Sequence, residues 1–187
     1  MRQGHASDEP ELIARSLKQD RDAFGTLVER YADAVFSLVC HMVGPGPAAR
    51  DLTEETFVCA FQTMSAFQAG SGFSTWLFRI AVTRCHTCLR SGHAGQQSAD
   101  GDSDAEMMAL YAPASQDPHE QAPHRFDQTV QRLPLLHREA FILKHVEGCS
   151  YEEIGDILMV GRETAKMRVY KARRRLCEEL IGLRDHG

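Results

Sequence analysis

Residues 148–176 read GCSYEEIGDILMVGRETAKMRVYKARRRL, and this stretch predicts how the helices in the second half of the chain are arranged. Ser150 and Glu153 have the spacing of a capping box, which starts a helix. That helix is short, because its apolar periodicity stops before a three-residue turn at 159–161. A longer helix then runs to about Leu180. The stretch therefore predicts a helix-turn-helix.

The longer helix is strongly basic. Residues 162–176 carry seven Lys or Arg and one acidic residue, a net +6 that suits the phosphates of a nucleic acid. Its apolar positions recur at helical spacing and form a core-facing stripe: Ala165, Val169, Ala172, Leu176 and Leu180. Residues near the start of this helix that lie outside the apolar stripe are placed to reach a major groove: Arg162, Glu163, Lys166, Met167, Tyr170 and Lys171. The alternative is a solvated basic face on an ordinary surface helix.

Two further helices are predicted before this stretch. Phe126, Val130 and Leu133 mark the first, and Pro134 can open the second at its first position. The second helix has four residues expected to face inward: Leu136, Ala140, Phe141 and Leu143. We therefore assign residues 127–187 to one helical domain.

Residues 91–126 have a different composition. They are rich in Gly, Ala, Ser, Gln, Asp and Pro, and they carry six acidic residues against one basic residue. Their net charge of −5 equals that of the whole chain. We interpret this segment as a flexible acidic linker, which either only tethers the two domains or also screens their basic surfaces.

The sequence pattern of residues 1–90 also predicts only helices. Asp20 can cap a helix that Gly-Pro-Gly-Pro at 44–47 would end. A second helix would bury five residues: Leu52, Phe57, Phe61, Met64 and Phe67. A third helix starts near Ser74 and runs to Arg90, and from Trp76 onward it contains Arg but no carboxylate. The predicted fold class is thus all-α, with two helical domains joined by the linker.

The composition excludes other classes of protein. Hydrophobic residues make up 43% and charged residues 25%, as in soluble globular domains. No apolar run is long enough for a membrane helix and the polar start is unlike a signal peptide, so we expect a cytoplasmic protein. Aromatic residues at 7% predict no large aromatic core. The six cysteines are expected to be reduced thiols.

Several of these segments resemble known motifs. Phe24, Leu27, Tyr31 and Val35, followed by ARDLTEETF at 49–57 and FSTWLFRIA at 73–81, resemble the second conserved region of bacterial sigma factors. The second domain resembles their fourth region in three places: Leu133–Phe141, Glu147–Ile154 and Thr164–Leu176. Two such regions joined by a short linker are the layout of the extracytoplasmic-function group.

The resemblance implies a role for each matched residue. The surface that docks on core RNA polymerase, at the beta-prime clamp, would comprise Asp51, Leu52, Glu54, Glu55 and Phe57. The element that captures the promoter's −10 strand would comprise Gln68, Gly70, Ser71, Phe73, Ser74, Trp76, Arg79, Thr83, Arg84, His86, Thr87 and Arg90. The −35 element would be read by Arg162, Thr164, Lys166, Met167, Tyr170, Lys171, Arg173 and Arg174.

The resemblance further implies the partners. They are core RNA polymerase (beta-prime clamp and beta flap), promoter DNA and an anti-sigma factor. The chain would associate with a membrane only indirectly, through that anti-sigma factor. No cofactor, metal, small-molecule substrate or catalytic residue is expected.

The chain departs from the family pattern at several positions. Thr83 and Thr87 stand where Asn, and Asp or Asn, are usual, so the −10 base preference is expected to differ. Met159 stands where Gly usually takes the left-handed turn conformation. Met167 replaces a small residue that faces the −35 groove, which predicts an unusual −35 motif.

The sequence offers less support for three other functions. A two-domain helix-turn-helix regulator, with a partner- or ligand-binding first domain, is the main alternative. Cys85 and Cys88 form a single CxxC, which leaves a thiol- or metal-sensing switch open, although packing of two small residues is favoured. An enzyme is not indicated, because the sequence lacks GxxxxGK, HExxH and GxSxG motifs.

Overall fold

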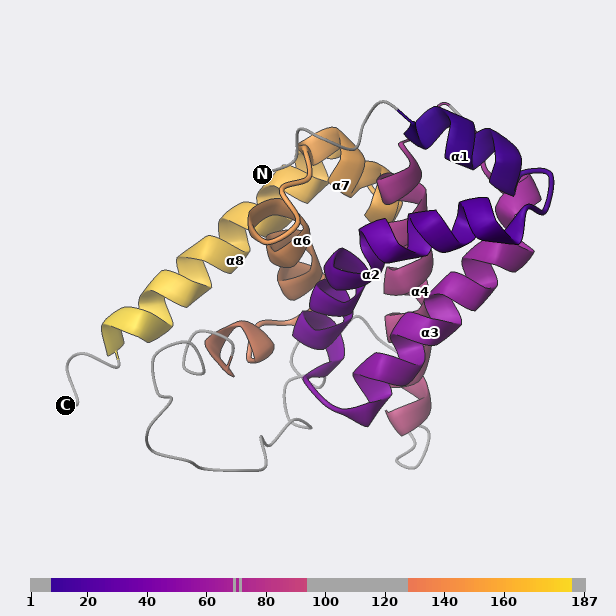
Figure 1. Ribbon diagram of the computed structural model, residues 1–187. Coiled ribbons are helices and arrows are strands. Elements are labelled where there is room, and N and C mark those ends of the chain that lie inside the picture. The colour runs from indigo at the N-terminus through magenta and orange to yellow at the C-terminus, as the bar shows by residue number, and fades with distance from the viewer. Residues whose placement is uncertain (1–7, 69, 71, 94–127, 183–187) are drawn as a thin grey trace.

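The computed structural model describes residues 8–68, 70, 72–93 and 128–182. Within these ranges every regular element is helical, which confirms the all-α fold class. The first group comprises α1 (Glu9–Ser16), α2 (Arg21–Val43), α3 (Pro47–Gln62), the 3₁₀ helix η1 (Met64–Ala66) and α4 (Phe73–His93). The second group comprises α6 (Leu135–His145), α7 (Tyr151–Leu158) and α8 (Arg162–Gly182). Figure 1 shows α8 as a long rod at the edge of the molecule.

The ends of α2 lie where the sequence predicts them. The Asp20 carboxylate accepts hydrogen bonds from the backbone N–H groups of Asp22 and Ala23, both at 3.1 Å. At the other end Gly44 takes a φ of 90°, a conformation that favours glycine, and Pro47 then opens α3. Helix α1 was not predicted from the sequence; it packs on α2, and the Tyr31 hydroxyl donates to Glu9 at 2.8 Å.

The first domain buries side chains of α2, η1 and α4 in one core. Leu27, Leu38, Met42, Met64 and Leu77 are all completely buried there. A second cluster is aromatic, and its members are Tyr31, Phe67, Phe73 and Trp76, with ring centroids 5.3–5.8 Å apart. The expectation of no large aromatic core is therefore wrong for this domain, because four of the few rings gather in one place.

The helix-turn-helix forms as predicted. Ser150 accepts from the Glu153 N–H, and the Glu153 carboxylate accepts from the Ser150 N–H at 2.7 Å, which completes the capping box. Met159 ends α7 in the left-handed conformation with a φ of 55°. The stripe Ala165, Val169, Ala172 and Leu176 is buried, while the side chain of Leu180 lies outside the described part.

Helix α6 differs from its prediction in two respects. Pro134 is the residue before the helix rather than its first residue, and its carbonyl accepts from the His137 and Arg138 N–H groups. Leu136 is 37% exposed instead of buried, whereas Leu135, Ala140, Phe141 and Leu143 face the core. The buried arc thus includes Leu135, one residue before the position that the sequence suggested. Phe126 lies outside the described residues.

The two domains pack against each other. Helix α4 contacts α7, and α2 contacts α6. Gln131 donates to the His41 carbonyl at 2.8 Å, and Arg138 donates to the Met42 carbonyl at 2.8 Å. Most of the predicted linker, from residue 94 on, lies outside the described residues, while residues 91–93 belong to α4. Among the described helices, none combines the length and the apolar character needed to cross a membrane.

Candidate nucleic-acid interface and docking groove

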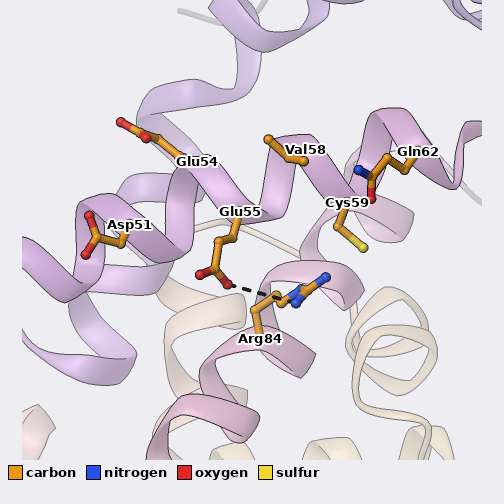
Figure 2. Close-up of a pocket in the computed structure, with 7 residues that line it drawn as sticks. All are labelled: Asp51, Glu54, Glu55, Val58, Cys59, Gln62 and Arg84. Carbon is orange, nitrogen blue, oxygen red and sulfur yellow. Dashed lines mark ion pairs between the residues drawn. The ribbon is translucent and has the colours of Figure 1, made fainter.

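An open groove of about 370 Å³ lies between α3 and α4. Figure 2 shows its lining: Asp51, Glu54, Glu55, Val58, Cys59, Gln62 and Arg84. The three carboxylates are exposed, and Val58, which lies beside them further along α3, is 55% exposed. Acidic side chains next to an exposed aliphatic side chain suit a basic partner that also offers an apolar contact.

Two residues predicted for this docking surface lie elsewhere. Leu52 is 6% exposed and Phe57 is 9% exposed, so both belong to the core of the first domain. Their burial agrees with the apolar periodicity of α3, but it conflicts with the docking contact that the resemblance implies for them, because the α3 face that carries Leu52 and Phe57 packs on the neighbouring helices. These residues support the surface from beneath, and Val58 supplies its exposed apolar side chain.

Arg84 points into the groove. Its guanidinium lies 3.9 Å from the Glu55 carboxylate, and this is the ion pair drawn in Figure 2. A hydrogen bond with Cys59 and the nearby Glu55 charge raise the pKa of Arg84 above its usual value. Arg84 therefore faces α3 across the groove, and its contact with the −10 strand stays a prediction.

The other candidates on α4 do share one face. Arg79, Thr83, His86, Thr87 and Arg90 recur at intervals of three and four residues, which places them along one side of a helix. Thr83, Thr87 and Arg90 are exposed. Arg79 and His86 instead bond to the second domain, as described below.

The segment before α4 presents a mixture of exposed and buried residues. Gln68 and Gly70 are exposed, while Ser74 and Trp76 are half-buried. Phe73 is only 2% exposed and packs in the aromatic cluster, so it supports the segment rather than lining its surface. Ser71 lies outside the described residues.

The basic face of α8 is open to solvent. All eight residues predicted to read the −35 element are exposed: Arg162, Thr164, Lys166, Met167, Tyr170, Lys171, Arg173 and Arg174. Met167 and Tyr170 are large and apolar or aromatic, yet they are 50% and 60% exposed. Two of the arginines have nearby carboxylates, since Arg162 lies 3.0 Å from Glu152 and Arg174 lies 2.8 Å from Glu178. The face is thus a basic surface with apolar side chains among its charges, a mixture that suits contacts with base edges and thymine methyl groups in a groove.

A carboxylate that sequence reasoning missed joins the two domains. Glu139 is 1% exposed, and its two oxygens lie 2.7 Å from His86 Nε2 and 3.0 Å from Arg168 Nη1. Arg79 donates twice to the Asp156 carbonyl, at 2.9 and 2.6 Å. One feature of the sequence could have indicated that Glu139 is buried and paired. It lies four residues from Leu135 and from Leu143, on the apolar arc of its helix, where an acid requires a buried partner.

One member of the CxxC pair lies in the packed interior, while Cys88 is half-buried. Cys85 is completely buried, and desolvation raises the pKa of its thiol to about 12. Cys40 is partly buried, and desolvation raises the pKa of its thiol as well. Among the described residues, no three His, Cys, Asp or Glu side chains gather in a way that would hold a metal ion. High thiol pKa values make these cysteines poor nucleophiles, which favours packing over sensing.

Comparison with known proteins assigns both domains. Residues 27–94 match the family described as sigma-70 region 2, and residues 124–176 match sigma-70, region 4. The sigma-E factor of Salmonella typhimurium is 32% identical over 87% of this chain and 88% of its own length. The factor SigW of Bacillus subtilis is 29% identical over 92% of this chain and 98% of its own. Both relatives are named as extracytoplasmic-function RNA polymerase sigma factors.

Solved structures share the fold. CnrH in complex with the cytosolic domain of CnrY matches with a TM-score of 0.69 and 22% identity, covering 94% of this chain and 97% of that one. The sigma factor RpoE from Bartonella quintana, in complex with the anti-sigma factor NepR, matches with a TM-score of 0.66 and 24% identity. That match covers 84% of this chain and 96% of the other. At these identities the likeness concerns the fold alone.

Proposed function

This chain belongs to the extracytoplasmic-function group of the sigma-70 family, whose members initiate transcription, and we propose how its surfaces divide that work. The observation that carries the proposal is the pairing of an acidic groove on one domain with an open basic recognition helix on the other. Members of this family act as binding subunits rather than enzymes. We propose the same for this chain, acting in the cytoplasm on core polymerase and promoter DNA.

The acidic groove is the proposed docking site for core polymerase. Asp51, Glu54 and Glu55 would face basic residues of the beta-prime clamp, and Val58 would add an apolar contact. Exposed carboxylates attract a basic partner over about 10 Å at ordinary salt, so they speed encounter as well as strengthen binding. The groove is lined by residues of α3 and α4 and by none of α8, so both surfaces can be used at once.

The basic helix α8 is the proposed reader of the −35 element. Lys166, Tyr170 and Lys171 would reach base edges, while Arg174 would contact phosphate. Met167 at 50% exposure would give the groove an apolar contact, which suits a thymine methyl group. The second domain would also meet the beta flap of the polymerase.

The exposed side of α4 is the proposed surface for the −10 strand. Thr83, Thr87 and Arg90 would line it, with Gln68 and Gly70 in the preceding segment wrapping a flipped-out base. A segment without bulky side chains can approach a base closely, which supports this role.

An anti-sigma protein is the proposed regulator. The structures with a similar fold include a sigma factor bound to its anti-sigma factor. A partner that contacts both the acidic groove and α8 would gain affinity from two linked contacts. It would then block polymerase and DNA together.

In vitro transcription tests this proposal. Purified chain and core polymerase are incubated with a library of promoters that vary at −10 and −35, and transcripts are sequenced. We expect initiation only when the chain is present, from promoters that share two elements. A helix-turn-helix regulator would give no transcript with core polymerase alone, and that result would overturn the proposal.

A further inference from the structure

We propose that α4 selects thymine in the −10 strand through the γ-methyl groups of Thr83 and Thr87. The inference rests on the proposed function and deepens it, because it names the base that the −10 surface prefers. Both threonines are exposed. They lie four residues apart, so they occupy one face of the helix, one turn from each other.

The hydroxyl groups of both threonines are already bonded within the helix. Thr83 Oγ1 donates to the Arg79 carbonyl at 2.8 Å, and Thr87 Oγ1 donates to the Thr83 carbonyl at 3.0 Å. A hydroxyl has one hydrogen to donate, so neither side chain keeps a donor for the acceptor atoms of a base. Each hydroxyl is held against its own backbone, and the methyl on the same Cβ stays free to meet a base.

These properties favour thymine. Thymine alone among the four bases carries a methyl group at C5, and a threonine methyl is one of the groups that pack on it. Guanine would instead present its O6 and N7 acceptors, which need a donor. Because the two hydroxyl hydrogens are used within α4, guanine at the same place would leave those acceptors unsatisfied.

Arg90 continues the same face and supplies a positive charge. It is exposed, and its Nε donates to the His86 carbonyl at 3.3 Å. A guanidinium has several further N–H donors, which can contact a phosphate. Phosphate contacts fix the position of a strand, whereas base contacts specify its sequence. The face therefore combines a residue that can hold the backbone with two residues that can select a base.

The spacing of the two threonines sets how many bases they can contact. Four residues of α-helix rise about 6 Å along the axis. Successive nucleotides of one stacked strand are about 3.4 Å apart. An unpaired strand also leaves the edges of its bases open to side chains. We therefore expect a preference for thymine at one or two positions of the −10 element.

Replacement of thymine by deoxyuridine tests the proposal, because it removes only the C5-methyl group. The complex of the chain with core polymerase is bound to a fluorescent single strand that carries the −10 sequence selected in the transcription assay. Each thymine is replaced in turn, and anisotropy gives the affinity. Loss of one buried methyl contact should weaken binding about fourfold at one or two positions.

Variants of the two threonines locate the effect. Thr83→Ser and Thr87→Ser keep the hydroxyl but lack the methyl, so the deoxyuridine penalty at the facing position should disappear. Thr83→Val and Thr87→Val keep a methyl group, so the penalty should persist. The matched control is Thr63→Ser, at an exposed threonine beyond the end of α3 whose hydroxyl donates to the Cys59 carbonyl at 2.7 Å. This control should retain the wild-type penalty.

Three results would overturn the proposal: a selected −10 element without thymine, no deoxyuridine penalty at any position, or a penalty that both serine variants retain. Failure of the proposed function gives a different result, because no transcript then appears with core polymerase on any promoter. Transcription that is indifferent to the thymine methyl rejects only the inference about Thr83 and Thr87. The two failures are therefore distinguishable.

Discussion

A β-carbon placed on Gly155 would lie 2.8 Å from the backbone carbonyl oxygen of Val160. The Val160 N–H in turn donates to the Gly155 carbonyl at 2.9 Å. The chain that leaves α7 thus folds back onto it so closely that only a hydrogen atom fits at position 155. This contact fixes the angle at which α8 leaves the turn.

Gly155→Ala should therefore destabilise the second domain. The clash is with backbone, which cannot rotate away, so we expect a loss of about 1–3 kcal/mol in the free energy of unfolding. Urea denaturation followed by circular dichroism measures it. The matched control is Gly25→Ala in α2, where the added carbon meets no atom within 4 Å and should stabilise by about 0.5–1 kcal/mol. Equal effects at the two positions would contradict the packing argument.

Met159→Gly should stabilise the same turn. Met159 has a φ of 55°, which costs a residue with a β-carbon about 1–2 kcal/mol, and glycine avoids that cost. The Met159 side chain is 80% exposed, so little packing is lost. We expect a gain of about 1 kcal/mol in the same denaturation experiment. A loss of stability would mean that the side chain makes contacts that its exposure does not reveal.

Residues on the open face of α8 should separate into two kinds. Arg174→Ala should weaken binding to all −35 duplexes alike, because a phosphate contact releases counterions whatever the sequence. The slope of log K against log salt concentration (the salt slope) should become shallower by about one unit. Met167→Ala should cost about 1–3 kcal/mol at one base pair only and leave the salt slope unchanged. Fluorescence anisotropy with singly substituted duplexes at several salt concentrations measures both effects. If both variants lose affinity for all duplexes alike and lower the salt slope equally, base reading by Met167 is refuted.

Charge reversal in the acidic groove should impair polymerase binding. Glu54→Lys places a cation where we propose a basic partner, and we expect at least a tenfold weaker association with core polymerase, which is about 1.4 kcal/mol. Glu29→Lys is the control, since Glu29 is exposed on α2 of the same domain. Size-exclusion chromatography or interferometry with core polymerase provides the measurement. Equal affinities for both variants would remove the groove as the docking site.

Thiol labelling should distinguish packing from sensing. The pKa of Cys85 is raised to about 12, so below that pH its thiol stays protonated and reacts slowly. Raising the pH toward 12 should increase its thiolate fraction and its rate. Cys177 is exposed and should be alkylated by iodoacetamide at pH 8 well before Cys85, which should react only after unfolding in guanidinium. Equal rates for the two cysteines in the native protein would support a sensing role.

Local features of this protein were determined by the sequence alone. The capping box at Ser150 depends on a few consecutive residues, as do the ends of α2 at Asp20 and Gly44. The open basic face of α8 follows from helical periodicity, because the apolar stripe fixes which side is buried. These features need no knowledge of distant contacts.

The tertiary structure was needed to show which faces of α4 and α6 are free and what the exposed side of α3 contacts. Periodicity predicted the burial of Leu52 and Phe57, but it did not show that the opposite side of α3, with Val58, forms a groove with Arg84 of α4. The bonds from His86 to Glu139 and from Arg79 to Asp156 join residues 53 and 77 positions apart. A local pattern carries no record of such pairs, because they form only when packing brings two separately formed helices together.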